Sequence, residues 1–194
     1  MDLTQGSIDE KRSRARKTMM WFAMISMTMT FAGLTSAYVV STSRKDWPEE
    51  FYFPNAFHWS TLAIILSSVT LLWAKKAIDK NNKRQGTRAL VVTLLFGLAF
   101  IGLQFSAFGE LVANGINVTG PTSNPKGSFL YIIVVTHIAH VIGGILVLLT
   151  LVYNQLRGYY YKGQTLGLEI GAMYWHFVDA IWLYLILFFY FFRT

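Results

Sequence analysis

Three histidines and one aspartate interrupt the last two long apolar stretches of this sequence. His137 and His140 lie three residues apart in the stretch THIAHVIGG, and His176 and Asp179 repeat this spacing in MYWHFVDAIWLYLILFFYFF. Residues three apart share one face of a helix. Imidazole and carboxylate groups bind metals and carry protons, and imidazoles also ligate haem. Inside a bilayer such groups are costly unless they face a partner or a cavity.

These residues belong to long apolar segments. Of the 194 residues, 54% are hydrophobic and only 14% are charged. About 20 apolar residues cross a hydrocarbon core roughly 30 Å thick. Five segments reach or approach this length, namely residues 18–40, 57–74, 89–113, 129–153 and 170–192. The sequence therefore predicts an all-α polytopic membrane protein, in which a basic N-terminal arm (residues 1–17) precedes a single domain of five transmembrane helices.

The net charge of +7 is distributed unevenly along the chain. Basic residues gather in the N-terminal arm, in the second connection and, more sparsely, in the fourth connection. In a five-span protein these regions share one side, which the positive-inside rule assigns to the cytoplasm or matrix. We therefore expect the N-terminus inside and the C-terminus outside, and we do not expect nucleic acid as a partner. Because the sequence has no cysteine, disulfides and thiolate metal sites are excluded.

The depth of the polar residues follows from the helical rise of 1.5 Å per residue. His140 lies about 16 Å from the outer end of its segment, and Asp179 lies about 14 Å from the inner end of its own. Both positions fall near the middle of a hydrocarbon core roughly 30 Å thick. The sequence therefore predicts a contact between Asp179 and a histidine of the fourth helix.

Three kinds of site fit these residues. A metal site would combine two histidines with Asp179, although the remaining acids of the apolar segments, Glu110 and Glu169, lie near helix ends. A haem site would use two of the three histidines on facing helices. A buried polar network would fix helix packing without any cofactor. One cluster near the midplane does not form the continuous polar path that a transporter or channel needs.

Other residues bear on how the helices meet. Gln104 lies inside the third apolar segment, and we expect it to form an interhelical hydrogen bond. Pairs of small residues four apart allow close helix packing in lipid. Such pairs are Ala32–Ser36, Gly33–Ala37, Gly102–Ser106 and Ala139–Gly143. We expect them to pack within the bundle, with docking onto a second membrane subunit as the alternative.

With these residues in view, the sequence resembles subunit III of the haem–copper terminal oxidases, in a short five-helix form. The last helix, GLEIGAMYWHFVDAIWLYL, is similar to that family's motif through Glu169, Tyr174, Trp175, His176, Phe177, Asp179 and Trp182. The fourth helix, GSFLYIIVVTHIAHVIGG, agrees through its two histidines. The shorter stretches GLAFIGLQ and FAGLTSAY match in the expected order.

The resemblance implies an accessory subunit of a respiratory enzyme. This chain would have no catalytic, cofactor-binding or metal-binding residue. Haem and copper would lie in partner subunits, and the chain would pack on subunit I, assemble with subunit II and other respiratory subunits, and bind structural phospholipids. We then expect Asp179, Glu169 and the three histidines to form one interhelical network, structural or proton-related, with Gln104 as a further buried polar residue.

The resemblance leaves three points open. The complex would oxidise cytochrome c, with a quinol oxidase or a nitric oxide reductase as alternatives and a self-contained haem b or metal-binding protein as a different class. The bacterial cytoplasmic membrane is the expected location, with the mitochondrial inner membrane as the alternative. Met27 stands where the family often has a buried glutamate, so a proton-related role for that carboxylate does not transfer.

Overall fold

The structure is a computed structural model that describes residues 7–48, 52–118, 120, 123–160 and 165–192. Within these residues the fold is entirely helical, with no β-strand. Five helices are long and apolar enough to cross a membrane. They are α1 (Ile8–Ser41), α2 (Ala56–Asp79), α3 (Lys83–Ala113), α4 (Pro125–Leu156) and α5 (Leu166–Phe191).

The five predicted segments are confirmed as helices, but most of them extend further at their polar ends. The clearest case is α1, which begins at Ile8, so residues 8–17 of the predicted arm are its first turns. Lysine and arginine are good helix formers, and their long stems let the charge reach water while the backbone stays helical. Hydropathy alone therefore marks only the apolar part of each helix.

Side-chain caps set several of the helix starts. Ser7 and Glu10 form a capping box at α1, with each side chain bonded to the other residue's backbone N–H. At α4, the Asn124 side chain accepts a hydrogen bond of 2.6 Å from the N–H of Gly127, and Pro125 occupies the first turn. The short turn between α2 and α3 uses a left-handed Asn81, with φ of 58°.

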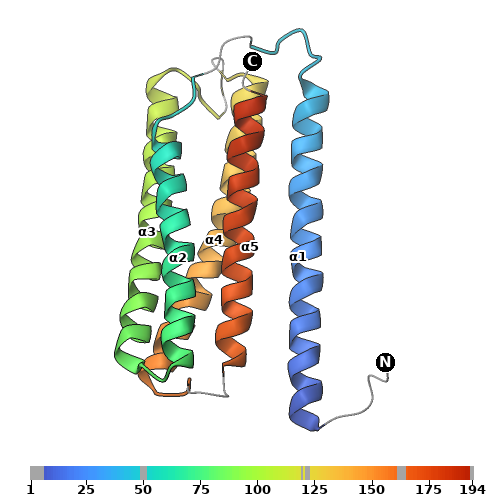
Figure 1. The fold of residues 1–194 in the computed structure, drawn as a ribbon. Helices are drawn as coiled ribbons and strands as arrows, with labels where there is room; N and C mark the ends of the chain where they lie inside the picture. The colour runs from blue at the N-terminus through green and yellow to red at the C-terminus, as the bar shows by residue number, and fades with distance from the viewer. Residues whose placement is uncertain (1–6, 49–51, 119, 121–122, 161–164, 193–194) are drawn as a thin grey trace.

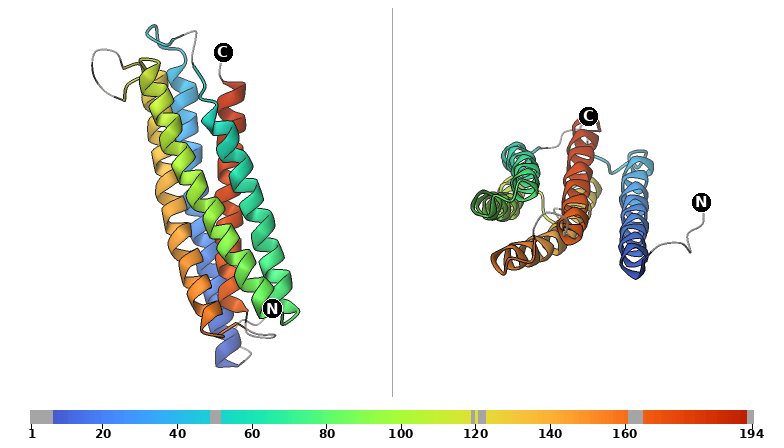
Figure 2. Two further views of the ribbon diagram at one scale, coloured as in Figure 1. Left: turned by 90° about the vertical axis from the view of Figure 1, so that its left-hand side faces the viewer. Right: turned by 60° about the horizontal axis from the view of Figure 1, so that its bottom comes forward.

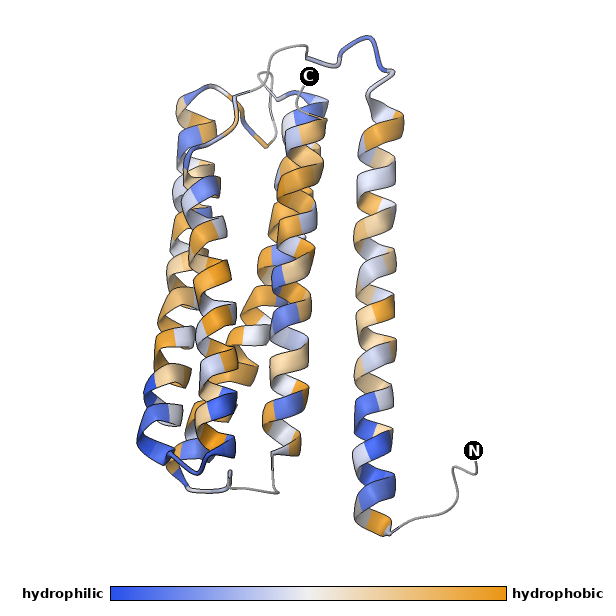
Figure 3. Ribbon diagram, in the orientation of Figure 1, coloured by the Kyte–Doolittle hydropathy of each residue, from blue (hydrophilic) through white to orange (hydrophobic). Residues whose placement is uncertain are grey.

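The helices run alternately up and down, and α5 lies at their centre (Figure 1). It contacts α1, α2 and α4, whereas α1 contacts only α4 and α5 among the helices. Figure 2 shows α1 at the side of the group formed by the other four helices. The polar ends of α1, α2 and α3 gather at one end of the bundle, which is opposite the C-terminus (Figure 3). The predicted grouping of the basic regions at one end is therefore confirmed.

The small-residue pairs lie mostly on the outside of the bundle, since of their members only Gly143 is not exposed. Ala32, Gly33, Ser36 and Ala37 are all exposed on α1, and a Cβ added at Gly33 would meet no atom within 4 Å. Gly102 on α3 is equally open. The expectation that these pairs pack within the bundle is wrong for α1 and α3, because both surfaces face away from the other helices. On α4 the adjacent Gly144 does pack inside, against Trp175.

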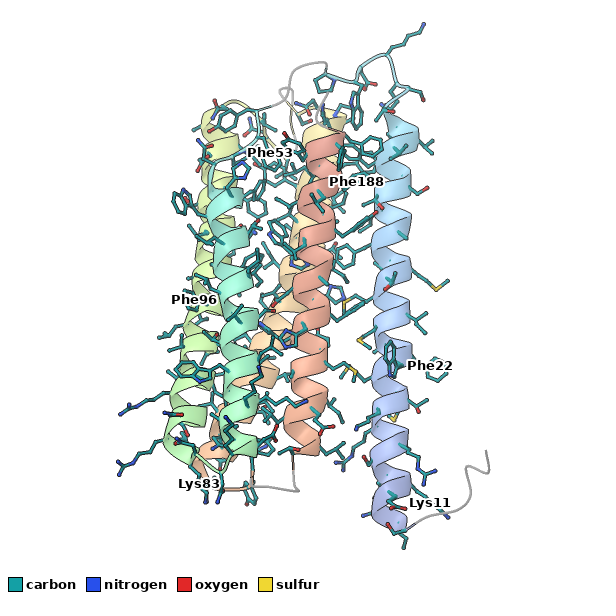
Figure 4. All side chains as sticks on the ribbon, viewed as in Figure 1. Lys11, Phe22, Phe53, Lys83, Phe96 and Phe188 are labelled. Carbon is teal, nitrogen blue, oxygen red and sulfur yellow. The ribbon has the colours of Figure 1, made fainter. Side chains whose placement is uncertain are left out.

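Contacts near both ends of the paired segments hold α1 against α5. Near the basic end, Lys17 Nζ lies 2.9 Å from Glu169 Oε2. Towards the other end, one turn before Tyr38, the hydroxyls of Thr35 and Tyr184 are 2.9 Å apart. Near the other end, Tyr38 packs edge-on against Phe188, which lies between α5 and α1 in Figure 4. On the far side of α1, Phe22 points away from α5 (Figure 4).

We expect the ion pair between Lys17 and Glu169 to contribute measurably to the attachment of α1. Reversing the charge in Lys17→Glu places two carboxylates side by side and should lower the unfolding midpoint in detergent. The loss should stay below about 1 kcal/mol, because both side chains are part-exposed and screened. Lys17→Glu combined with Glu169→Lys should restore the midpoint, and Lys11→Glu on the same helix is the matched control. A double variant no more stable than Lys17→Glu would contradict the pairing.

Candidate functional site

The predicted polar residues of α5 are held by a serine of α2. The Ser68 hydroxyl donates to Asp179 Oδ2 and lies 2.9 Å from Nδ1 of His176. A hydroxyl has one proton and two lone pairs, so Ser68 can bridge the two residues when His176 donates from Nδ1. Asp179 is only 4% exposed. One α2 hydroxyl therefore joins both polar residues that the motif places three apart.

This serine belongs to a row of hydroxyls on α2 that the sequence analysis missed. Ser60 accepts a 3.1 Å hydrogen bond from Gln104 Nε2, and Thr61 accepts a 3.0 Å bond from Trp182 Nε1. Ser67 accepts a 2.8 Å bond from Trp175 Nε1. Ser60 and Ser67 are seven residues apart, as are Thr61 and Ser68, and this spacing returns to the same helical face after two turns. This seven-residue spacing is the sequence feature from which the row could have been predicted.

Trp175 is the large side chain around which four helices meet. It comes from α5, is 1% exposed and bonds to Ser67 of α2. A Cβ added at Gly97 of α3 would lie 2.7 Å from its Cη2 atom, and one added at Gly144 of α4 would lie 2.9 Å from its Cε3 atom. The indole is therefore packed between two glycine backbones, with its N–H bonded to a third helix.

His137 lies in a different environment, an enclosure of aromatic rings. Its ring stacks on Trp182 at 5.2 Å between centroids, with Phe100 at 5.9 Å and Phe31 at 6.0 Å. The side chain is fully buried and neither ring nitrogen has a hydrogen-bond partner. A porphyrin ligated by His137 would have to displace these rings, so the enclosure does not fit a haem site.

The predicted contact between Asp179 and a histidine of α4 is wrong. Asp179 bonds to Ser68, and its other oxygen has no partner. His140 bonds through Nδ1 to the carbonyl of Thr136 on its own helix, at 2.7 Å. Depth along the membrane was inferred from helical rise, but rise does not give the rotation of each helix, and α5 turns its carboxylate towards α2.

The single network predicted for Glu169 and the histidines is also wrong. Glu169 pairs with Lys17 at the basic end of α5, about two helical turns from His176 and nearly three from Asp179. The link from α5 to the histidine region of α4 comes instead from Tyr174, whose hydroxyl donates to the carbonyl oxygen of His140 at 3.0 Å. The polar residues thus form several separate contacts.

One expectation about a polar side chain is confirmed. Gln104 forms the predicted interhelical hydrogen bond, to Ser60. At the end near the C-terminus, Glu110 accepts hydrogen bonds from the Tyr52 hydroxyl and the Asn55 backbone, so a loop satisfies it. In the same loop region Arg44 donates two hydrogen bonds of 2.9 Å to Asp46, which lower the pKa of that carboxyl.

The arrangement can position helices, but it does not assemble a ligand set. Among the described residues, no group of three histidine, aspartate or glutamate side chains lies close enough to hold a metal ion. The candidate site is therefore the interface of α5 with α2, α3 and α4, defined by Ser60, Thr61, Ser67, Ser68, Gln104, Trp175, His176, Asp179 and Trp182. We call it the hydroxyl-anchored interface.

Comparison with known proteins gives this interface its context. The sequence profile described as cytochrome c oxidase subunit III matches residues 15–194. The chain belongs to the cytochrome c oxidase subunit III family. The predicted resemblance is thus confirmed, and the motif on which it depended provides the buried α5 side of the hydroxyl-anchored interface.

Individual members of the cytochrome c oxidase subunit III family match about two thirds of the chain. Cytochrome c oxidase subunit 3 of Petromyzon marinus is 34% identical over 129 residues, which are 65% of this chain and 46% of that protein. The Homo sapiens protein of the same name is 33% identical over 129 residues, with the same coverage. The Spodoptera frugiperda protein is 34% identical, covering 65% and 82%. The chain spans about half the length of the first two.

Met27 lies inside the bundle, on α1. The side chain is 7% exposed and belongs to the hydrophobic core of the bundle. A flexible thioether fills such a space without needing a hydrogen-bond partner. No ionisable group is therefore present at this point of α1.

We expect the glycines beside Trp175 to be intolerant of even one methyl group. Gly97→Ala should destabilise the chain by about 1–3 kcal/mol, because the new Cβ would overlap the indole and the backbone cannot move freely. Gly102→Ala is the matched control on the same helix, where the added Cβ meets nothing within 4 Å. Thermal unfolding in detergent tests this, and equal midpoints for both variants would contradict the packing.

Removing the Ser68 hydroxyl should cost more than removing an exposed one. Ser68→Ala leaves a buried carboxylate oxygen and an imidazole nitrogen without partners, which costs roughly 1–3 kcal/mol. Ser106→Ala on the exposed face of α3 is the control and should leave the midpoint unchanged. The same thermal measurement applies, and Ser68→Thr, which keeps a hydroxyl, should recover part of the loss.

Proposed function

We propose that this chain is a non-catalytic subunit of a respiratory haem–copper oxidase, that it stabilises the catalytic subunit I, and that it binds membrane lipid. The complex would pass electrons to O₂ and translocate protons, with haem and copper in partner subunits. The observation that carries this proposal is the family match over residues 15–194.

The structure of α5 supports an architectural role. The motif residues Tyr174, Trp175, His176, Asp179 and Trp182 each bond to a neighbouring helix. A residue used in this way fixes the packing of α5 against its neighbours. The inner face of α5 is thus occupied by contacts that hold this chain together.

The distribution of charge supports an orientation in the membrane. The starts of α1, α3 and α5 and the ends of α2 and α4 share the basic end of the bundle (Figures 1 and 3). By the positive-inside rule this end would face the cytoplasm or matrix, and the C-terminus would lie outside.

The exposed small residues of α1 support a docking surface for a partner subunit. Helices associate in lipid where small side chains allow the backbones to approach closely. Ala32, Gly33, Ser36 and Ala37 form two overlapping small pairs on the exposed surface of α1. We assign this surface to contact with the catalytic subunit.

Purification from native membranes in mild detergent tests the proposed complex. A tagged chain should co-purify with a large haem-containing subunit, and a reduced-minus-oxidised spectrum should show haem a. Oxygen consumption with added cytochrome c or quinol then identifies the electron donor. A chain that purifies alone and carries its own chromophore would overturn the proposal.

Enlarging a residue on the docking surface should separate the subunits without unfolding this chain. Gly33→Leu should reduce co-purification of the haem subunit, whereas the thermal midpoint of the isolated chain should not change, because a Cβ at Gly33 meets nothing within 4 Å. Gly102→Leu on α3 is the matched control and should leave co-purification intact. Equal co-purification of both variants would assign the docking surface elsewhere.

A further inference from the structure

A pocket with a volume of about 390 Å³ lies in the seam between α1 and α5, outside the hydroxyl-anchored interface. Its lining includes Thr28, Phe31 and Ala32 of α1 and Phe177, Ala180 and Tyr184 of α5. We call it the α1–α5 pocket. Ala32 and Ala180 are exposed, so the pocket opens on the outer surface of the bundle. It lies near the middle of the membrane, because Ala180 follows Asp179 in the sequence.

The two hydroxyls that line the pocket donate their protons within this chain. Thr28 donates to the carbonyl oxygen of Met24 at 2.9 Å. The hydroxyl of Tyr184 lies 2.9 Å from that of Thr35, which itself donates to the carbonyl oxygen of Phe31 at 2.9 Å. Because Thr35 has only one proton, Tyr184 is the donor in their contact. Each pocket hydroxyl therefore offers an occupant lone pairs but no proton.

The pocket thus combines apolar walls with hydrogen-bond acceptors. Its other described lining residues, such as Phe177 and Ile181, have apolar side chains. The matching occupant has a large apolar body and one donor, and it carries no charge, because charge is costly at this depth. A tryptophan side chain meets these requirements, since its indole N–H only donates. Hydroxyl and amide side chains bring acceptors as well, and a lipid acyl chain brings no donor.

The interior of the same chain uses this pairing twice. Trp182 donates its indole N–H to Thr61, and Trp175 donates to Ser67. Both accepting hydroxyls donate their own proton to a carbonyl of α2, at 2.7 Å and 2.9 Å. A hydroxyl that has donated in this way is therefore an effective acceptor for an indole inside this bundle. The hydroxyls of the α1–α5 pocket are in the same condition.

Tyr184 is the better acceptor of the two pocket hydroxyls. Its proton goes to Thr35, whose proton goes to the carbonyl of Phe31, so three groups form a chain of hydrogen bonds. Each bond in such a chain polarises the next, which strengthens the terminal oxygen as an acceptor. Tyr184 is also 47% exposed, so a neighbouring molecule can reach its side chain.

The α1–α5 pocket is continuous with the surface of α1 that we assign to the catalytic subunit. Ala32 lines the pocket and also belongs to that surface. A transmembrane helix packed against Ala32 and Ser36 would pass the mouth of the pocket. It could then insert one large side chain between α1 and α5.

We propose that the α1–α5 pocket receives a tryptophan side chain from a transmembrane helix of the partner subunit, and that the indole N–H donates to the phenolic oxygen of Tyr184. Phe31 and Phe177 contact the indole ring, and Ala32 and Ala180 leave room for it. The inference rests on the proposed function and specifies the docking contact within it.

Filling the pocket in the purified complex tests this contact. Ala180→Phe places a ring in the pocket and should lower retention of the haem subunit several-fold in a detergent titration. The thermal midpoint of the isolated chain should not fall, because Ala180 is exposed. Ala99→Phe on the exposed surface of α3 is the matched control and should leave retention intact. Unchanged retention in Ala180→Phe, with fewer lipids bound in native mass spectrometry, would assign the pocket to an acyl chain and overturn the proposal.

A second pair of variants isolates the acceptor. Tyr184→Phe and Thr35→Val both remove the internal bond between the two hydroxyls, but only Tyr184→Phe removes the oxygen that accepts from the indole. Retention of the haem subunit should be about twofold to tenfold weaker in Tyr184→Phe than in Thr35→Val, because one more hydrogen bond is lost. Equal retention by the two variants would overturn the role of Tyr184.

A double-mutant cycle identifies the tryptophan itself. Each tryptophan in the transmembrane helices of the co-purified haem subunit is replaced by phenylalanine, alone and together with Tyr184→Phe. One of them should give losses that are not additive with Tyr184→Phe, because both changes remove the same hydrogen bond. Additive losses for every tryptophan would overturn the proposal while the complex itself remains intact. An unsubstituted chain that purifies without a haem subunit would instead overturn the proposed function, and this contact with it.

Discussion

The indole of Trp175 is the constraint on which the arrangement of the helices depends. Lipid provides no hydrophobic drive for helix association, so the helices must gain from close packing and from hydrogen bonds. Trp175 provides both, because its ring lies against Gly97 and Gly144 while its N–H bonds to Ser67. Either glycine replaced by a larger residue would push a helix outwards. The position of α3 and α4 relative to α5 thus follows from the indole of Trp175 and from the absence of a side chain at Gly97 and Gly144.

The hydroxyls of α2 provide hydrogen-bond partners for polar groups that are buried inside the membrane. Ser60 and Ser67 donate to carbonyls of their own helix and accept from Gln104 and Trp175. A hydroxyl that returns its proton to its own helix leaves lone pairs for a neighbour, so the cost of burying a polar group is offset on both sides. This arrangement needs no ion pair in the interior. The ion pair that joins α1 to α5, between Lys17 and Glu169, lies near the basic end of the bundle.

Much of the fold could be predicted from the sequence, but the partners of its polar residues could not. Apolar length identified all five helices, and the position of Gln104 within an apolar segment correctly implied an interhelical bond. Asp179 was assigned to the wrong helix because helical rise gives depth, whereas the partner depends on the rotation of α5 about its axis. A single serine in a membrane helix does not indicate which residue it bonds to, so the structure was needed to identify Ser68 as the partner of Asp179. The exposure of Gly33 could likewise not be predicted, because it depends on how α1 packs against the other helices.

The inner face of α5 and the open surface of α1 have different roles in this chain. The inner face of α5 packs against α2, α3 and α4, with hydrogen bonds from Trp175 and Asp179 to α2. The surface open to a partner subunit lies elsewhere, on α1 around Gly33. A partner could therefore bind there without disturbing the tryptophan around which the other helices are packed.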